Sequence, residues 1–186
     1  MFTFRRLTRD DFGLLATWLA EPHVHHWWTN EFTPDALEDD FGPTADGDEP
    51  AEDFIVSLDG DPIGVIQYCH FVDNPEYVDE MRDVYPVGGG AVSIDYLVGD
   101  PEQVGKGVGS AMIAAFVERI WSVDRDATHV VVPVNSANER SWRALLRAGF
   151  RPVARGELEP DGPEHDRMHE VLCIDRPDDG AAIHEP

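Results

Sequence analysis

The sequence predicts an α+β fold in which helices flank a mixed β-sheet. The first observation is the order of segments with strand-like or helix-like hydrophobic spacing, which reads β α α β β β α β α β β. The second is one unit of strand, glycine-rich loop and helix at the centre of the chain, from Ala91 to Trp121. The third is size and composition, because 186 residues of which 42% are hydrophobic suffice for one core.

The first half of the chain predicts a strand, two helices and a β-hairpin. Thr8 is a good N-cap, and Phe12, Leu15 and Leu19 follow at helical spacing. A Thr-Pro pair starts the second helix, and two apolar runs around an Asp-Gly-Asp turn indicate the hairpin. In chain order we expect a strand at Thr3–Leu7, a helix at Thr8–Ala20, a loop or irregular helix end at His23–Trp28, a helix at Thr33–Phe41, an exposed loop at Gly42–Glu52, and strands at Asp53–Leu58 and Pro62–Phe71.

The second half begins with a segment that lacks periodicity and ends in three glycines, which is typical of a long functional loop. A nearly continuous apolar strand follows it, and a strongly amphipathic helix comes after the glycine loop. The expected segments are a loop at Val72–Gly90, a strand at Ala91–Gly99, helices at Val108–Trp121 and Asn138–Phe150, a strand at His129–Val134 between them, and two strands within Arg151–Leu158 and Met168–Ile174.

Residues 1–176 are expected to form a single domain, and residues 177–186 a flexible C-terminal tail. The first twenty residues contain no apolar run long enough for a signal peptide or a membrane span. Cys69 and Cys173 are far apart in the sequence and flanked by apolar residues, as expected of buried free thiols. We therefore expect a cytoplasmic protein.

The charge balance is unusual, with 37 acidic residues against 14 basic ones and a net charge of −23. Such a surface repels nucleic acid and anionic membranes, so both are excluded as partners. It has two possible explanations, which are attraction of a polycationic substrate and adaptation to high salt. The acidic residues are spread over every segment, and this favours salt adaptation.

The glycine loop predicts a site for phosphate. Backbone N–H groups between a strand and a helix N-terminus bind anionic oxygen without side-chain charge. A nucleotide triphosphatase loop fits poorly, because Val104 lies in place of a required glycine and Gly107 in place of the hydroxyl that would hold magnesium. A dinucleotide-binding fingerprint also fits poorly, since the glycine spacing differs and the loop comes late in the chain.

The loop and a later segment together resemble the GCN5-related N-acetyltransferase (GNAT) superfamily. Its pyrophosphate loop reads Gln or Arg, two residues, Gly, one residue, and Gly or Ala, and Val104–Gly109 matches it except at the valine. Val134–Phe150 is similar to a later strand–helix segment with an N-x-x-N start and a G-F finish. The resemblance implies a GNAT fold with a mostly antiparallel sheet, and acetyl-CoA as the co-substrate.

Four further segments resemble the aminoglycoside 6′-N-acetyltransferases and their siderophore-biosynthetic relatives: Thr17–Trp28, Gly60–Tyr68, Ser93–Gly109 and Pro160–Pro163. This implies direct acetyl transfer to an amine of a cationic small molecule, with an aminoglycoside 6′-amine as the model acceptor. Antibiotic resistance would then be one role, though not necessarily the natural one. Two alternatives stay open, which are the same fold acting on a hydroxylysine-type siderophore precursor or a polyamine, and a non-catalytic module that binds CoA or a protein. We expect a monomer or a homodimer.

The resemblance implies a cofactor-binding set. The loop N–H groups would hold the pyrophosphate, the strand backbone would pair with the pantetheine arm, and the N–H of Val98 is a candidate oxyanion donor. Asn138 matches a residue that contacts this arm, although it is also a plausible helix N-cap. The full set is Tyr96, Leu97, Val98, Gln103, Val104, Gly105, Lys106, Gly107, Val108, Gly109, Ser110 and Asn138.

Asp95 is the candidate catalytic residue. It interrupts an apolar strand, where a carboxylate is costly unless it has a purpose, and it matches the strand aspartate that aminoglycoside enzymes use for the acceptor. Such a carboxylate can pair with the incoming ammonium and take its proton; a structural ion pair is the alternative. Trp27, Trp28, Tyr77 and Asp161 are candidate acceptor contacts beside it, with core or turn positions as their alternatives.

Two further points concern groups that the site would lack. His25 and His26 have no third ligand at a suitable spacing, so no metal site is expected. The superfamily commonly has a tyrosine in the last helix that protonates the departing thiolate, and Leu145 lies there in this chain. Solvent could protonate the thiolate instead, or a hydroxyl such as Ser141 or Tyr96.

If the acidic surface is an adaptation to salt, we predict that the protein loses thermal stability as salt is removed, since its carboxylates then repel one another over a longer range. Thermal unfolding followed from dilute buffer to molar salt measures this. A melting temperature unchanged across that range would contradict salt adaptation.

Overall fold

The computed structural model describes residues 1–160, 162–163 and 165–177. It confirms the predicted α+β class, with one seven-stranded sheet in the order β1-β2-β3-β4-β5-β7-β6. All neighbouring strands are antiparallel except β4 and β5. The strands are β1 (Phe2–Arg6), β2 (Ala51–Leu58), β3 (Asp61–His70), β4 (Ala91–Val98), β5 (His129–Asn135), β6 (Arg151–Glu157) and β7 (Met168–Asp175).

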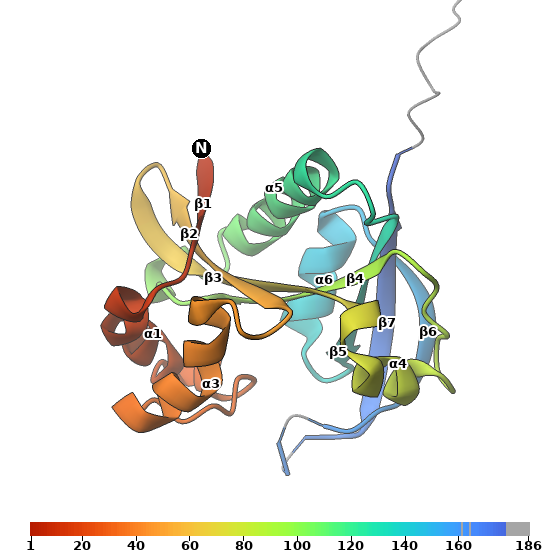
Figure 1. Cartoon of the computed structure of the whole chain (residues 1–186), viewed down its shortest axis with the longest axis horizontal. Coiled ribbons are helices and arrows are strands. Elements are labelled where there is room, and N and C mark those ends of the chain that lie inside the picture. Colours follow the sequence, from red (N-terminus) through yellow and green to blue (C-terminus); the bar gives the residue numbers. More distant parts are fainter. Residues whose placement is uncertain (161, 164, 178–186) are drawn as a thin grey trace, which may run out of the picture.

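Helices cover both faces of the sheet because buried side chains alternate along its strands. On one face, α5 and α6 pack over the core that includes Ile94 and Phe116. On the other, α1 and α3 cover the first strands and α4 the last ones; Figure 1 shows α5 on the opposite side of the sheet from α1 and α3. The helices are α1 (Phe12–Leu19), α2 (Pro22–His25), α3 (Pro34–Asp46), α4 (Pro75–Met81), α5 (Val108–Val123) and α6 (Glu139–Arg147), with short 3-10 turns at Arg9–Asp11, Phe71–Asp73 and Pro101–Gln103.

The parallel pair β4–β5 is short, and this positions the site. Ala91 pairs with His129 and Val92 with Val130, after which the two strands diverge. Beyond that point β4 is paired only with β3, through to Val98, while β5 continues beside β7 to its end. The second half of β4 therefore has an open edge inside the molecule rather than at the border of the sheet.

The predicted exposed loop at Gly42–Glu52 was wrong in part, because α3 continues through Asp46 and β2 begins at Ala51, which leaves only residues 47–50 as an exposed loop. Pro43 inside the helix explains the error, since a proline usually ends a helix. Here Thr44 is buried one turn after Phe41, and its hydroxyl donates a hydrogen bond to the Asp53 carboxylate of β2. Gly47, with a φ of 78°, then ends the helix.

The predicted long loop at Val72–Gly90 was wrong in part, because it contains α4. Phe71 and Met81 are 3% and 2% exposed and anchor this helix over Val131 and Val171. The helix has only seven residues, too few for hydrophobic periodicity to be visible in the sequence. Within the described ranges, no helix is both long and apolar enough to span a bilayer.

Candidate active site

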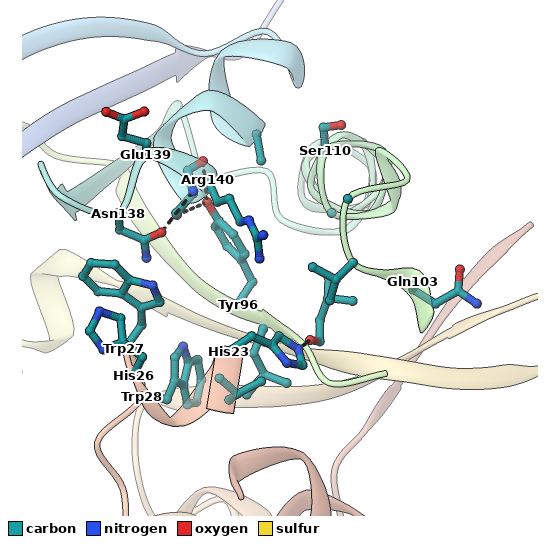
Figure 2. A pocket seen from close by; sticks show the side chains of 18 of the residues that line it. His23, His26, Trp27, Trp28, Tyr96, Gln103, Ser110, Asn138, Glu139 and Arg140 are labelled. Carbon is teal, nitrogen blue, oxygen red and sulfur yellow. Dashed lines mark hydrogen bonds between the residues drawn. The ribbon is translucent and has the colours of Figure 1, made fainter. Parts of the chain in front are cut away.

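A cavity of about 670 Å³ lies along the open edge of β4, between α2, the glycine loop and α6 (Figure 2). Two of the predicted cofactor residues do not line it: the Lys106 side chain is exposed, and Val108 packs against the core under α5. The other ten do line it, and they are Tyr96, Leu97, Val98, Gln103, Val104, Gly105, Gly107, Gly109, Ser110 and Asn138.

The glycine loop owes its shape to two left-handed residues. Gly105 has a φ of 80° and Gly107, the N-cap of α5, a φ of 81°, a conformation that costs other residues roughly 1–2 kcal/mol. The protein itself leaves space at the helix start, because a Cβ at Gly107 meets nothing within 4 Å and one at Gly109 meets only Val98 at 3.6 Å. The loop thus presents backbone N–H groups at the positive end of a sixteen-residue helix, which suits phosphate oxygens.

The open edge of β4 presents backbone polar groups to the same cavity. The N–H of Gly99 donates to the Ile63 carbonyl at 2.8 Å, which fixes the alternation of the β3–β4 ladder. By that alternation, the N–H and C=O groups of Tyr96 and Val98 point away from β3. His23 Nε2 donates to the Val98 carbonyl at 2.8 Å and ties α2 to this edge. His23 was not among the predicted site residues.

A pair of hydroxyl groups joins β4 to α6 across the gap. The Tyr96 hydroxyl lies 2.7 Å from Ser141 Oγ, and both residues line the cavity. Burial raises the pKa of Tyr96, while its hydrogen bond with Ser141 acts in the opposite direction. Leu145, which replaces the usual tyrosine, is fully buried in the core of this face. Tyr96 and Ser141, which sequence analysis named as possible proton donors in place of that tyrosine, thus have their hydroxyl groups together between β4 and α6.

Asn138 is the N-cap of α6, because its side-chain oxygen accepts a hydrogen bond from the Ser141 N–H at 3.2 Å. The N-cap alternative is thus confirmed. The side-chain NH2 group makes no hydrogen bond within the part of the chain that the structure describes, and it remains available as a donor toward the cavity.

A second cavity, of about 230 Å³, adjoins the first one and shares part of its lining, including Trp27, Trp28, Tyr96 and Ser141. In Figure 2 Trp27 is drawn just below Asn138, and Trp28 lies further down, beside α2. Tyr77 and Asp95 line the second cavity but not the first one. Four of the five predicted acceptor residues therefore lie together, while Asp161 lies outside the described residues.

The expectation that Asp95 is buried was wrong, because its side chain is exposed on β4 and lines the second cavity. The apolar neighbours in the sequence did not reveal that a cavity covers this stretch of the strand. Burial and, to a lesser extent, the Asp95 carboxylate raise the pKa of the Cys69 thiol to about 12. The same two causes, together with the Cys69 thiol, raise the pKa of Tyr77. The Asp95 carboxylate thus contributes to the raised pKa of two other residues that line the second cavity, Cys69 and Tyr77.

Sequence analysis missed several other lining residues. In the second cavity these include Cys69, which is only half-buried, and two carboxylates, Glu80 and Glu159. Glu80 accepts a hydrogen bond from the Glu159 N–H at 2.8 Å, so α4 and the end of β6 meet here. In the first cavity they include Arg140 and Arg147, whose spacing of seven places them on one face of α6.

The region around α2 is further held by aromatic contacts. His165 donates to the His26 carbonyl at 2.7 Å, and its ring lies 5.1 Å from that of Trp27. These contacts fix a wall shared by both cavities. Across the described ranges, no three histidine, cysteine or carboxylate side chains are grouped so that they could hold a metal ion.

Comparison with known proteins identifies relatives of this arrangement. Residues 8–158 match the family model described as an acetyltransferase (GNAT) domain. The chain is similar to aminoglycoside N(6′)-acetyltransferase type 1 of Klebsiella pneumoniae, with 30% identity over 166 residues, which cover 87% of this chain and 79% of that protein.

Solved structures give the same picture. The structure of AAC(6′)-Ib in complex with ribostamycin and coenzyme A matches with a TM-score of 0.74 and 26% identity, over 94% of this chain and 93% of that one. A spermidine N-acetyltransferase chimera that includes the Vibrio cholerae protein has a TM-score of 0.69 and 15% identity, over 94% of this chain and 95% of that one, and shows the shared fold alone.

We predict that Cys69 reacts slowly with iodoacetamide at pH 8 and that Asp95→Asn speeds the reaction severalfold. With a pKa of about 12 the thiol is almost entirely protonated at pH 8, and removing the nearby carboxylate lowers that pKa and increases the thiolate fraction. Mass spectrometry of the Cys69 peptide over a pH series measures the rate. Glu118→Gln, on the opposite face of the sheet, is the control for charge alone. Equal rates in the two variants would contradict the proximity of Asp95 and Cys69.

Proposed function

Because the chain belongs to the GNAT acetyltransferase family, we propose that it transfers the acetyl group of acetyl-CoA directly to an amine of a polycationic small molecule, with an aminoglycoside 6′-amine as the model acceptor. One observation carries the proposal. A cavity lined by a glycine loop at a helix N-terminus and a cavity lined by carboxylates adjoin each other at the open edge of β4. The family assignment favours this enzyme over a non-catalytic CoA-binding module.

In the first cavity, the N–H groups of Val104–Gly109 would hold the pyrophosphate, and the open edge of β4 would pair with the pantetheine arm. The thioester then reaches the gap beside Tyr96 and Ser141. The N–H of Val98 points to the same side of β4 and would stabilise the oxyanion of the attacked carbonyl. Lys106 would contribute its backbone N–H rather than its exposed side chain.

In the second cavity, Asp95 pairs with the acceptor ammonium and takes one proton from it, directly or through a water molecule. The neutral amine attacks the thioester carbonyl carbon, so a C–N bond forms as the C–S bond breaks. The nitrogen, positively charged after the attack, loses one further proton to solvent and keeps one as the amide N–H, and the CoA thiolate takes up one proton. Acetylated acceptor and free CoA are the products.

The lining of the second cavity supports a cationic acceptor. Asp95 and Glu80 contribute two carboxylates, and a third one, that of Glu159, forms an ion pair with Arg167 at 2.6 Å. Tyr77, Trp27 and Trp28 add apolar walls. The volume of about 230 Å³ suits one amino-sugar ring or one linear polyamine. The names of the aminoglycoside acetyltransferases to which the chain is similar fit this class. Two free thiols also fit the cytoplasmic location that we propose.

We test this function by measuring thiol release from acetyl-CoA in high salt across aminoglycosides with and without a free 6′-amine, spermidine and N-hydroxylysine. We expect turnover with the aminoglycosides that have a free 6′-amine, and NMR of the product identifies the acetylated nitrogen. Turnover with spermidine or N-hydroxylysine alone would overturn the model acceptor and support the alternative class.

The role of Asp95 gives a second prediction. Asp95→Asn should lower kcat/KM for the acceptor at least about tenfold, because the variant can neither pair with the ammonium nor take its proton. Glu118→Gln removes the same charge outside both cavities and should leave kcat/KM unchanged. Near-normal activity of Asp95→Asn would remove Asp95 from the mechanism.

We further propose that the Tyr96 hydroxyl, hydrogen-bonded to Ser141, protonates the departing thiolate. A tyrosine hydroxyl is protonated at neutral pH, and the hydrogen bond with Ser141, which lowers the pKa of Tyr96 against the effect of burial, favours donation. Tyr96→Phe should lower kcat about tenfold and change the KM for acetyl-CoA little. Tyr85→Phe, which lies outside both cavities, is the matched control. If kcat of Tyr96→Phe equals that of the wild type, solvent is the proton donor.

A further inference from the structure

Most arginines of this acidic chain are neutralised by carboxylates. They are fixed by ion pairs such as Arg5–Asp11, Arg9–Glu38, Arg151–Asp175 and Arg167–Glu159. On α6 itself, Arg143 pairs with Glu139 at 2.9 Å and lies over the Trp142 ring. Eight of the thirteen arginines are paired with a carboxylate in this way, and Arg119 and Arg176 lie over aromatic rings. Arg125 has none of these contacts within the described residues, but it lines neither cavity.

Arg140 and Arg147 differ from that pattern. Neither makes an ion pair or a hydrogen bond with the residues that the structure describes, and both line the larger cavity. They are seven residues apart on α6, so they lie on one face about 10 Å apart along its axis. In Figure 2 the Arg140 side chain extends into the space between α6 and the segment that carries Gln103.

The electrostatics of the site call for such groups. The chain carries a net charge of −23 and would repel a ligand with several phosphate charges. The glycine loop offers only the partial charges of N–H groups and the helix dipole, and the Lys106 side chain does not line the cavity. Planar guanidinium groups match phosphate oxygens in geometry and charge.

We propose that Arg140 and Arg147 bind phosphate groups of acetyl-CoA from the α6 side, opposite the glycine loop. The inference rests on the proposed function in one respect, which is that acetyl-CoA occupies the larger cavity. The two arginines then provide whole positive charges for the phosphates, in addition to the partial charges of the loop N–H groups. The pantetheine arm is uncharged and needs no such partner.

The test is calorimetric binding of three ligands to the full chain: acetyl-CoA, acetyl-dephospho-CoA, which lacks the ribose 3′-phosphate, and acetyl-pantetheine, which lacks every phosphate. We expect the double variant R140Q/R147Q to bind acetyl-CoA at least about tenfold more weakly than the wild type does. Its affinity for acetyl-pantetheine should stay within about twofold of the wild-type value. The loss should shrink as salt is added.

Two controls separate this effect from others. Arg125→Gln removes a positive charge near the far end of α5, outside both cavities, and should leave all three affinities unchanged. R140K/R147K keeps the charge and should recover part of the affinity for acetyl-CoA. Equal melting temperatures show that the variants fold, and the single variants replace the double one if it does not.

The outcomes are distinct. A loss for acetyl-CoA alone assigns the arginines to the 3′-phosphate, and an equal loss for acetyl-dephospho-CoA assigns them to the pyrophosphate. No loss for acetyl-CoA, or the same loss for acetyl-pantetheine, would overturn the proposal. The measurement needs no acceptor, so a protein that binds acetyl-CoA through these arginines yet acetylates nothing would refute only the proposed function.

Discussion

The separation of β4 from β5 is the constraint on which the rest of the site depends. The two strands pair at only two positions, from Ala91 and Val92, and then diverge. A strand inside a sheet normally has both edges paired, because unpaired backbone groups away from water are costly. Here the gap is held open from both faces, with His23 bonded to the Val98 carbonyl and Tyr96 bonded to Ser141 of α6. The two cavities follow from this gap, since one runs along the open edge and the other adjoins it.

The site also separates charge in a molecule that is acidic almost everywhere. The first cavity combines a helix N-terminus with the arginines of α6, and the second holds Asp95 with two glutamates. Under the proposed function, an anionic donor and a cationic acceptor would thus be directed to neighbouring places. This arrangement is physically reasonable. The negative field of the whole protein attracts a cationic acceptor, whereas only local positive groups can hold an anionic donor.

Much of the fold and of the lining of the first cavity could be predicted from sequence because the signals are local. The apolar strand, the glycines that adopt positive φ and the amphipathic helix occur in one continuous stretch from Ala91 to Val123. The failures have equally specific causes. Helix α4 is too short for periodicity, and α3 continues through a proline. The exposure of Asp95 depends on the divergence of β5, which lies over thirty residues away in the chain. For Arg140 and Arg147 the helical spacing is visible in the sequence, but the lack of a carboxylate partner appears only in three dimensions.

Hydrogen–deuterium exchange with and without acetyl-CoA tests the central claim most directly. If the donor binds along the open edge of β4, the amides of Tyr96, Val98 and Val104–Gly109 should become protected when acetyl-CoA is added. The amides of β1, which lies at the other border of the sheet and lines neither cavity, should not change. Binding detected by calorimetry without protection of the β4 and loop amides would contradict the account, because the donor would then occupy another part of the molecule.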